Sequence, residues 1–255
     1  MENPLKYSLT TRFKDSRIFG LLEIAPGERL LDVGCGIGYL CELGREAGAL
    51  VYGMDKSRQA LHYAAATVEG KFAAASAEGL PFRSNSFDKI IFADVIEHVP
   101  DDQKVLREIV RVARPGARIV ISTPALEGVF TRTWLKTLLH GEEDEFQKNY
   151  REGYTADSLA ALMRDCHIGD SEVVYTNFFL SEIFLGLTKI SYALKKKSYN
   201  SQADLVDLSA SVPFRIYKSL LFPVFLSLGR LEEWLVRRWV KGHCLIVGGT
   251  INKGL

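Results

Sequence analysis

Short apolar runs alternate with longer amphipathic stretches from Arg29 to Thr123, and this alternation limits the chain to few folds. The runs have the length and continuous hydrophobicity of strands that are buried on both faces. They are Leu30–Val33, Leu50–Met54, Phe72–Ala75, Ile90–Ala93 and Ile119–Ser122. The stretches between them, Gly38–Ala47, Ser57–Val68 and Asp101–Ala113, have a helical pattern. Strands separated by helices predict a parallel sheet covered on both faces, which is a doubly wound α/β fold.

Local signals place some element boundaries. Ser57 is a predicted helix N-cap, and Pro115-Gly116 is a predicted helix stop. In the second half of the chain the pattern is less regular. It predicts further helices at Phe130–His140 and Ala156–Asp165 and further strands at Glu172–Thr176 and His243–Gly248.

Length, charge and cysteine spacing restrict the functional classes. A chain of 255 residues fits a single domain, and a net charge of +1 gives no electrostatic reason to expect a nucleic-acid partner. The four cysteines and the histidines lack metal-binding spacing, so we expect no metal site. Residues 1–11 are polar, and no apolar stretch is long enough to span a membrane. We therefore expect a cytoplasmic protein that at most lies on a membrane surface.

The segment Leu30–Leu40 (LLDVGCGIGYL) passes from a predicted strand through three glycines into a predicted helix. Such a turn lets a ligand approach the backbone closely, and the helix N-terminus favours an anionic group. A dinucleotide fingerprint needs a third glycine or alanine where this chain has Tyr39, so that pattern fails. Asp32 would repel a pyrophosphate but could accept hydrogen bonds from an ammonium group. A ligand with both an ammonium and a carboxylate fits better, although a merely structural glycine turn stays open.

Asp55 ends the second apolar run, some twenty residues after Gly34. A short acidic side chain at the end of a strand can accept hydrogen bonds from both hydroxyl groups of a ribose. The alternative is a charge that interacts with the dipole of the helix beginning near Ser57. With the glycine turn beside it, we favour ribose binding.

Four blocks, in sequence order, resemble the class I S-adenosylmethionine-dependent methyltransferases. They are LDVGCGIG, GMDKS, SAEGLPFRSNSFDKIIFADVIEHV and ARPGARIVISTP, and the resemblance covers residues 12–123 and the last strand. The branch most similar is the small-molecule one that includes quinone-biosynthesis enzymes. The resemblance implies a Rossmann-like, mostly parallel seven-stranded sheet with an antiparallel pair formed by the sixth and seventh strands. It also implies S-adenosylmethionine as cofactor, with S-adenosylhomocysteine as product.

The resemblance also implies a set of cofactor-binding residues. They are Asp32, Gly34, Cys35, Gly36, Asp55, Lys56, Ser76, Ala77, Glu78 and Asp94. Asp32 and the glycines would hold the methionine end and Asp55 the ribose, while Asp94 would face the methyl-bearing side. Ser76, Ala77 and Glu78 would border the adenine. The family usually has Asp at the position of Ser76, so Ser76 or Glu78 would have to replace that contact.

Methyl transfer from a sulfonium requires alignment of the acceptor, exclusion of water and, for some acceptors, removal of a proton. His98, just after the fourth predicted strand, is the candidate base, with Tyr150 and Tyr154 as weaker candidates. Glu97 and His98 could equally be structural, because the pair belongs to the family pattern across different acceptors. A wholly structural role therefore stays open.

We expect one methyltransferase domain over residues 1–255. It divides into a cofactor core (12–123), a helical substrate-side segment (124–167), an apolar helical insertion (177–241) and a last strand (242–250). Three interpretations of the insertion are open: a helical cap, an aromatic lid over an apolar acceptor, or a helix on a membrane surface. Lys195–Lys197 fits the third interpretation or a solvated turn.

The predicted function is methyl transfer to a small, apolar acceptor such as a lipid, an isoprenoid or a quinone. One alternative is a non-catalytic interaction protein that retains the fold, which would have no need for both Asp32 and Asp55. An NAD-dependent oxidoreductase is the other, and Tyr39 argues against it. The acceptor atom and the oligomeric state are not indicated by the sequence.

Overall fold

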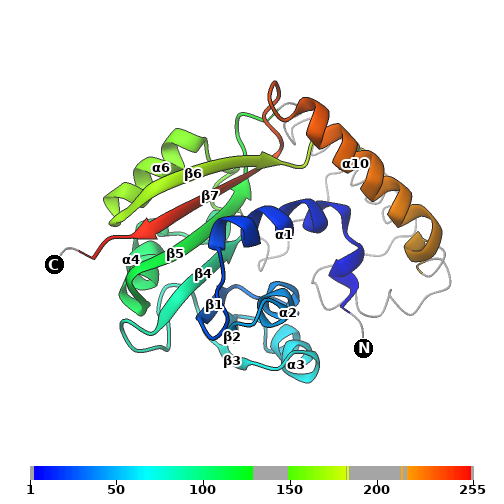
Figure 1. Ribbon diagram of the computed structural model, residues 1–255. Helices are drawn as coiled ribbons and strands as arrows, with labels where there is room; N and C mark the ends of the chain where they lie inside the picture. The colour runs from blue at the N-terminus through cyan, green and yellow to red at the C-terminus, as the bar shows by residue number, and fades with distance from the viewer. Residues whose placement is uncertain (1–2, 129–148, 182, 184–213, 215–216, 254–255) are drawn as a thin grey trace.

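The computed structural model describes residues 3–128, 149–181, 183, 214 and 217–253, which contain one seven-stranded sheet (Figure 1). The strand order is β3-β2-β1-β4-β5-β7-β6. The strands are β1 (Arg29–Val33), β2 (Leu50–Asp55), β3 (Lys71–Ala74), β4 (Phe87–Ala93), β5 (Ala113–Pro124), β6 (Ile168–Thr176) and β7 (Cys244–Ile251). Strands β1 to β5 pair in parallel, and β7 is antiparallel to both β5 and β6. The predicted fold class is confirmed.

Helices lie on both faces of this sheet (Figure 1). They are α1 (Leu9–Leu22), α2 (Tyr39–Glu46), α3 (Arg58–Thr67), α4 (Asp102–Val112), α6 (Ala156–Asp165) and α10 (Phe222–Val236). Short helical turns occur at Pro4–Tyr7, Ile96–His98 and Tyr217–Leu221. Helices α1, α2 and α3 cover one face, and α4 and α6 cover the other.

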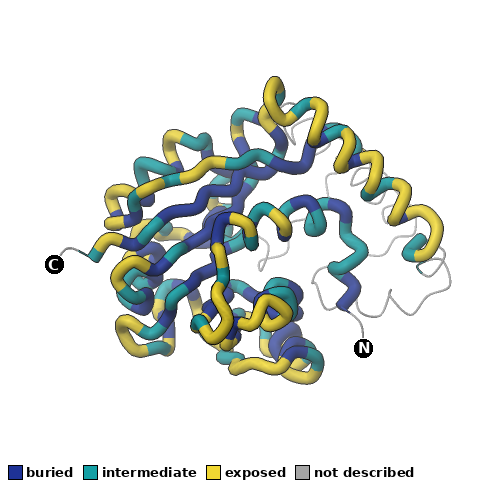
Figure 2. The backbone as a smooth tube through the Cα atoms, viewed as in Figure 1, coloured by how far each residue is buried: buried dark blue, intermediate teal, exposed yellow. Residues whose placement is uncertain are grey.

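Each face of the sheet has its own apolar core, and the central strands are buried along their length (Figure 2). Neighbouring strand residues point to opposite faces, so Leu30 packs beneath α1 and α2 while Leu31 packs on the α4 side. Both leucines are fully buried. This explains why the predicted strands are continuously apolar rather than alternating.

Two local predictions are confirmed. Ser57 caps α3 as predicted, because its hydroxyl accepts the backbone N–H of Ala60 at 3.2 Å. Helix α4 ends at Val112, just before Pro115-Gly116, as predicted, and the chain continues directly into β5, which contains both residues. The β4–β5 register shifts between Phe87 and Lys89, opposite this part of β5. Such an irregularity accommodates a proline, which cannot donate to the ladder.

Helix α1 is not among the predicted elements, although it packs against β7, β5 and α10. Its N-cap is Ser8, and its C-cap, Glu23, has a left-handed conformation. Apolar residues and the carboxylate of Asp15 are both buried along it. The mixture of buried polar and apolar positions hides the helical period in the sequence.

Some expectations lie outside the described residues, namely the helix at Phe130–His140 and the lysines at 195–197. Helix α10 confirms helical structure in the described part of the segment before β7. Among the described helices, none combines the length and hydropathy needed to cross a bilayer. The described residues also contain no group of three metal-binding side chains. The division of the chain into functional segments stays a prediction.

Two helical glycines give a matched test of this packing. A Cβ on Gly44 of α2 would lie 2.3 Å from Cδ2 of the buried Leu30, whereas one on Gly20 of α1 would meet nothing within 4 Å. We expect Gly44→Ala to lower the free energy of unfolding by about 1–3 kcal/mol through overpacking. Gly20→Ala should raise it by about 0.5–1 kcal/mol, because alanine restricts the unfolded chain. Thermal melts that shift in the same direction for both variants would contradict this packing.

Candidate cofactor site at the carboxyl edge of the sheet

The carboxyl ends of β1, β2 and β4 meet at one edge of the sheet. The parallel register pairs Asp32 with Gly53 of β2 and with Ile91 of β4. Asp55, the last residue of β2, and Asp94, the first residue after β4, therefore lie at the same edge. Ligands of doubly wound folds bind in the crevice outside such strand ends.

The turn after β1 is held against the end of β2. The backbone N–H groups of Gly34 and Cys35 both donate to the Met54 carbonyl, at 2.8 and 2.9 Å. Gly34 and Gly36 have φ values of 82° and 51°, in the region that favours glycine. A Cβ on Gly34 would also lie 2.4 Å from Cγ2 of Val95, which follows β4. The glycines thus serve a definite turn that approaches two neighbouring strands.

Asp55 joins the glycine turn to the start of α3. Its Oδ2 accepts the Gly36 N–H at 2.8 Å, and its Oδ1 accepts the Ser57 N–H, also at 2.8 Å. Each carboxylate oxygen has a second lone pair, so Asp55 retains capacity for two further donors. The side chain is partly exposed, which allows a ligand to reach it.

Asp32 has a different environment, with only 2% of its surface exposed. Burial raises the pKa of Asp32 to about 7, and the charge of Asp55 contributes to this increase. The Cys41 thiol donates a hydrogen bond to Oδ2 of Asp32 at 3.5 Å, which opposes the increase in pKa. A carboxyl group with a pKa of about 7 at this place can lose its proton when a cationic ligand binds beside it.

The residues predicted to border the adenine form the turn after β3. Ser76 is exposed, and its hydroxyl accepts the Glu78 N–H at 3.3 Å. Ala77 is buried, and the Glu78 carboxylate lies 3.6 Å from the Lys104 ammonium. Lys56, on the neighbouring turn after β2, is exposed.

Asp94, at the end of β4, contacts a residue that sequence analysis missed. Its Oδ1 accepts the Ser122 hydroxyl at 3.0 Å, and its Oδ2 pairs with Lys14 of α1. Burial disfavours the charge of Lys14, but the carboxylate of Asp94 outweighs this effect, and the pKa of Lys14 is raised. Asp94 has a φ of 54°, which is uncommon for a residue other than glycine. Lys14 is 80 residues away in sequence and carries no local signal of this contact.

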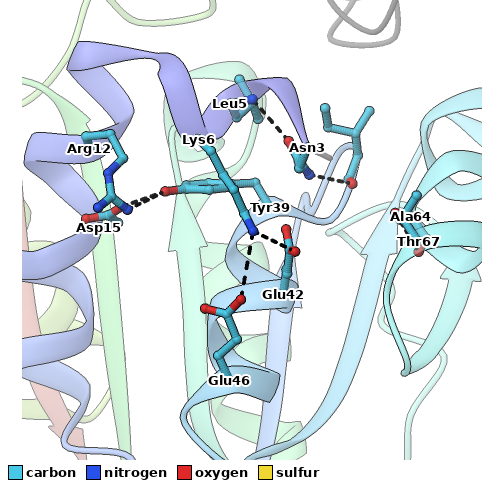
Figure 3. A network of polar contacts seen from close by, with 11 residues as sticks. Asn3, Leu5, Lys6, Arg12, Asp15, Tyr39, Glu42, Glu46, Ala64 and Thr67 are labelled. Atoms are coloured by element: carbon cyan, nitrogen blue, oxygen red, sulfur yellow. Dashed lines mark hydrogen bonds and ion pairs between the residues drawn. The ribbon is translucent and has the colours of Figure 1, made fainter. Parts of the chain in front are cut away.

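The N-terminal segment also braces the far side of the glycine turn (Figure 3). The Tyr39 hydroxyl donates to Oδ2 of the buried Asp15 at 2.5 Å, and Arg12 donates to the same oxygen at 2.9 Å. Asn3 donates to the Ile37 carbonyl at 3.3 Å. Tyr39, which stands where a dinucleotide fingerprint needs glycine or alanine, therefore links α1 to the first turn of α2.

The candidate bases lie near this edge in unequal settings. His98 is half-buried in the turn Ile96–His98, which follows β4. Its neighbour Glu97 is buried. The Glu97 carboxylate accepts a hydrogen bond from the Thr123 hydroxyl at 3.2 Å, and the Glu97 backbone carbonyl accepts one from the Tyr150 N–H at 2.9 Å. The Tyr154 hydroxyl donates to Asp102 at 2.7 Å, and burial and this bond raise the pKa of Tyr154. These contacts favour a structural role for Glu97 and Tyr154, and the base role of His98 stays a prediction.

Tyr39→Phe tests the brace. Removing the hydroxyl leaves the buried Asp15 carboxylate with one donor fewer, so we expect the free energy of unfolding to fall by about 1–3 kcal/mol. The control is Tyr52→Phe, which removes a hydroxyl from a half-buried tyrosine of β2 outside this network. Denaturant unfolding measures both, and an equal loss in the two variants would rule out a special role for the brace.

Comparisons with known proteins agree with this geometry. Residues 31–121 match the family model of a methyltransferase domain. Methyltransferase GfsG of Streptomyces halstedii is 36% identical over 120 residues, which are 44% of this chain and 43% of that protein. A ubiquinone biosynthesis O-methyltransferase of Ralstonia nicotianae is 40% identical over 103 residues, or 38% and 43% of the two chains. The chain thus spans less than half the length of these relatives.

A solved structure is similar over nearly the whole chain. It is a methyltransferase of Thermotoga maritima described as S-adenosylmethionine-dependent, with a TM-score of 0.60 and 19% identity. The match covers 96% of this chain and 92% of that one, and at this identity it shows the fold. The resemblance found in the sequence is therefore confirmed, and residues 31–121 match a methyltransferase domain.

Proposed function

We propose that the protein transfers a methyl group from S-adenosylmethionine to a small, apolar acceptor. The observation that carries the proposal is the position of Asp32 and Asp55 on either side of the glycine turn. Asp32 is buried and Asp55 is partly exposed, with both at the carboxyl edge of the sheet. This pair suits a ligand that has an ammonium group at one end and a ribose in its middle.

The chemistry of the site fits this cofactor part by part. The ammonium group of the methionine end would interact with the Asp32 carboxylate, and the close backbone at Gly34–Gly36 would admit the carboxylate. Asp55, whose oxygens each have a lone pair to spare, would accept the ribose hydroxyls. Ser76, Ala77 and Glu78 would border the adenine, with Lys56 nearby. Cys35 would contribute its backbone, since its side chain is buried.

The bound cofactor supplies an electrophilic methyl group, so the protein itself needs no nucleophile or metal. The work of the chain is to hold the acceptor in line and exclude water. Asp94 is kept in place by Ser122 and Lys14 and would face the reacting side of the cofactor. His98, on the turn after the same strand, would remove a proton from acceptors that must lose one.

The apolar acceptor has two supports. One relative is named as a ubiquinone biosynthesis O-methyltransferase, and a quinone-like acceptor for the present protein would agree with that similarity. In the described part of the segment before β7, several large apolar side chains are also exposed, among them Leu220, Leu228 and Leu231. We therefore favour a lipid-, isoprenoid- or quinone-like acceptor over a nucleic acid, in agreement with the near-zero net charge.

Asp55→Asn tests the ribose contact. Asparagine keeps one acceptor oxygen but replaces the other with a donor, so two charge-assisted hydrogen bonds are weakened. We expect the affinity for S-adenosylhomocysteine to fall roughly 10- to 100-fold in calorimetric titration. Asp157→Asn, in the first turn of the distant α6, is the control and should leave the affinity unchanged. Equal affinities for Asp55→Asn and the native protein would remove the ribose assignment.

Asp32 predicts a pH dependence of stability. Its pKa is 3.8 in the reference state and about 7 in the folded protein, so the folded state binds more protons than the unfolded state between these values. Asp32 therefore contributes its full share to the free energy of unfolding at low pH. This contribution decreases as the pH rises from about 4 to about 7. Relative to the native protein, Asp32→Asn should become more stable as the pH rises from about 5 to about 8. Parallel pH profiles would contradict the assignment.

The same group predicts a pH dependence of binding. A ligand ammonium prefers the ionised carboxylate, so cofactor affinity should rise towards neutral pH and binding should release a proton below about pH 7. Calorimetry in buffers of different ionisation enthalpy measures that proton. In Asp32→Asn we expect weaker binding with no such release, and an unchanged release would assign the proton to another group.

A further inference from the structure

Helix α10 carries an apolar face that is turned away from the protein body. Val224, Leu228, Leu231 and Leu235 recur at helical spacing, and each is between 45% and 56% exposed. Trp234, beside this row, is 66% exposed. In Figure 2 the helix runs along the outside of the molecule with its exposed residues in repeated turns. We call the row formed by these residues the outer face of α10.

The opposite side of α10 is fixed to helix α1. Gly229 lies so close to Phe13 that a Cβ would meet the ring at 2.3 Å. Glu233 is buried and pairs with Arg17 of α1 at 3.1 Å. Phe222 is buried against Tyr7, with an edge-to-face arrangement of the two rings. The orientation of the helix is thus set by specific contacts, and so is the outward direction of the apolar row.

Charge divides between the two sides of α10 in the same way. Residues 217–241 contain five basic and two acidic residues. Both acidic side chains are engaged on the inner side, because Glu232 accepts the Leu180 N–H at 3.1 Å and Glu233 pairs with Arg17. Arg230, Arg237 and Arg238 are exposed. The outward side of the helix therefore combines apolar residues, tryptophan and arginine.

We propose that the outer face of α10 docks on an anionic lipid membrane, with the helix lying in the interface plane. Leucine side chains would enter the acyl boundary, and Trp234 and Trp239 would sit at headgroup level, where amphipathic rings are favoured. Trp239 is 86% exposed just after the helix. The arginines would pair with lipid phosphates. A second copy of the chain fits less well, because a twofold contact through this face would bring the same basic groups together.

The docked helix would be linked to the candidate site through α1. Helix α10 packs on α1, and α1 carries Lys14 to Asp94 at the carboxyl edge of the sheet. Figure 1 shows α1 between α10 and the strands. Docking itself depends on neither the acceptor nor the catalytic activity, so it can be tested separately from the proposed function.

The test is flotation of the full chain with vesicles of two compositions. One is phosphatidylcholine alone, and the other is an equal mixture of phosphatidylcholine and phosphatidylglycerol. We expect binding to the anionic vesicles that weakens as salt is added, and much weaker binding to neutral ones. Leu231→Gln/Leu235→Gln should lower the partition coefficient at least roughly tenfold through lost apolar burial. Arg237→Gln/Arg238→Gln should lower it roughly tenfold at low salt.

The control is Leu50→Gln, which changes a leucine that is 54% exposed at the start of β2, far from α10. It should bind vesicles as the native protein does. Calorimetry with S-adenosylhomocysteine on every variant separates loss of docking from loss of the cofactor site. Native protein that stays unbound to anionic vesicles would overturn the proposal, as would undiminished binding by both double variants. A native dimer in light scattering that Leu231→Gln/Leu235→Gln converts to a monomer would instead assign this face to a second copy.

Discussion

The carbonyl group of Met54, at the end of β2, accepts hydrogen bonds from both Gly34 and Cys35, and the arrangement of the site depends on this attachment. It draws the turn after β1 against the neighbouring strand, where only glycine fits the backbone and the space beside Val95. Asp55 completes the attachment by accepting the Gly36 N–H. A single parallel register thereby brings one buried and one partly exposed carboxylate to the same turn. Their surroundings differ, since burial raises the pKa of Asp32 to about 7 while Asp55 stays partly exposed.

The N-terminal segment links this site to the rest of the molecule. Arg12 and Asp15 hold Tyr39 at the start of α2, and Lys14, between them, reaches Asp94 on the other side of the edge. Helix α1 thus contacts the site at two places while its outer side receives α10. Helix α1 therefore gives α10 a physical connection to the candidate cofactor site.

The sequence was sufficient for the parts of the structure that are governed by local pattern. The buried strands, the cap at Ser57 and the antiparallel last pair follow from hydrophobic runs, capping chemistry and family resemblance. Helix α1 was missed because the buried carboxylate of Asp15 stands among its buried apolar residues and blurs the helical period. The contacts of Lys14 and Tyr39 could not be predicted, because each depends on segments that only the folded chain brings together. Strand β5 begins at Ala113, well before the predicted run Ile119–Ser122, because an irregular pairing of β4 and β5 accommodates Pro115.

The most direct test is a crystal structure of the protein with S-adenosylhomocysteine. We expect the ligand over the glycine turn, with its ribose hydroxyls hydrogen-bonded to Asp55, its amino group on the Asp32 side and its adenine beside residues 76–78. Electron density for the ligand at another place would contradict the assignment of this edge as the cofactor site. So would a ribose that makes no contact with Asp55, even if the ligand lay near the turn.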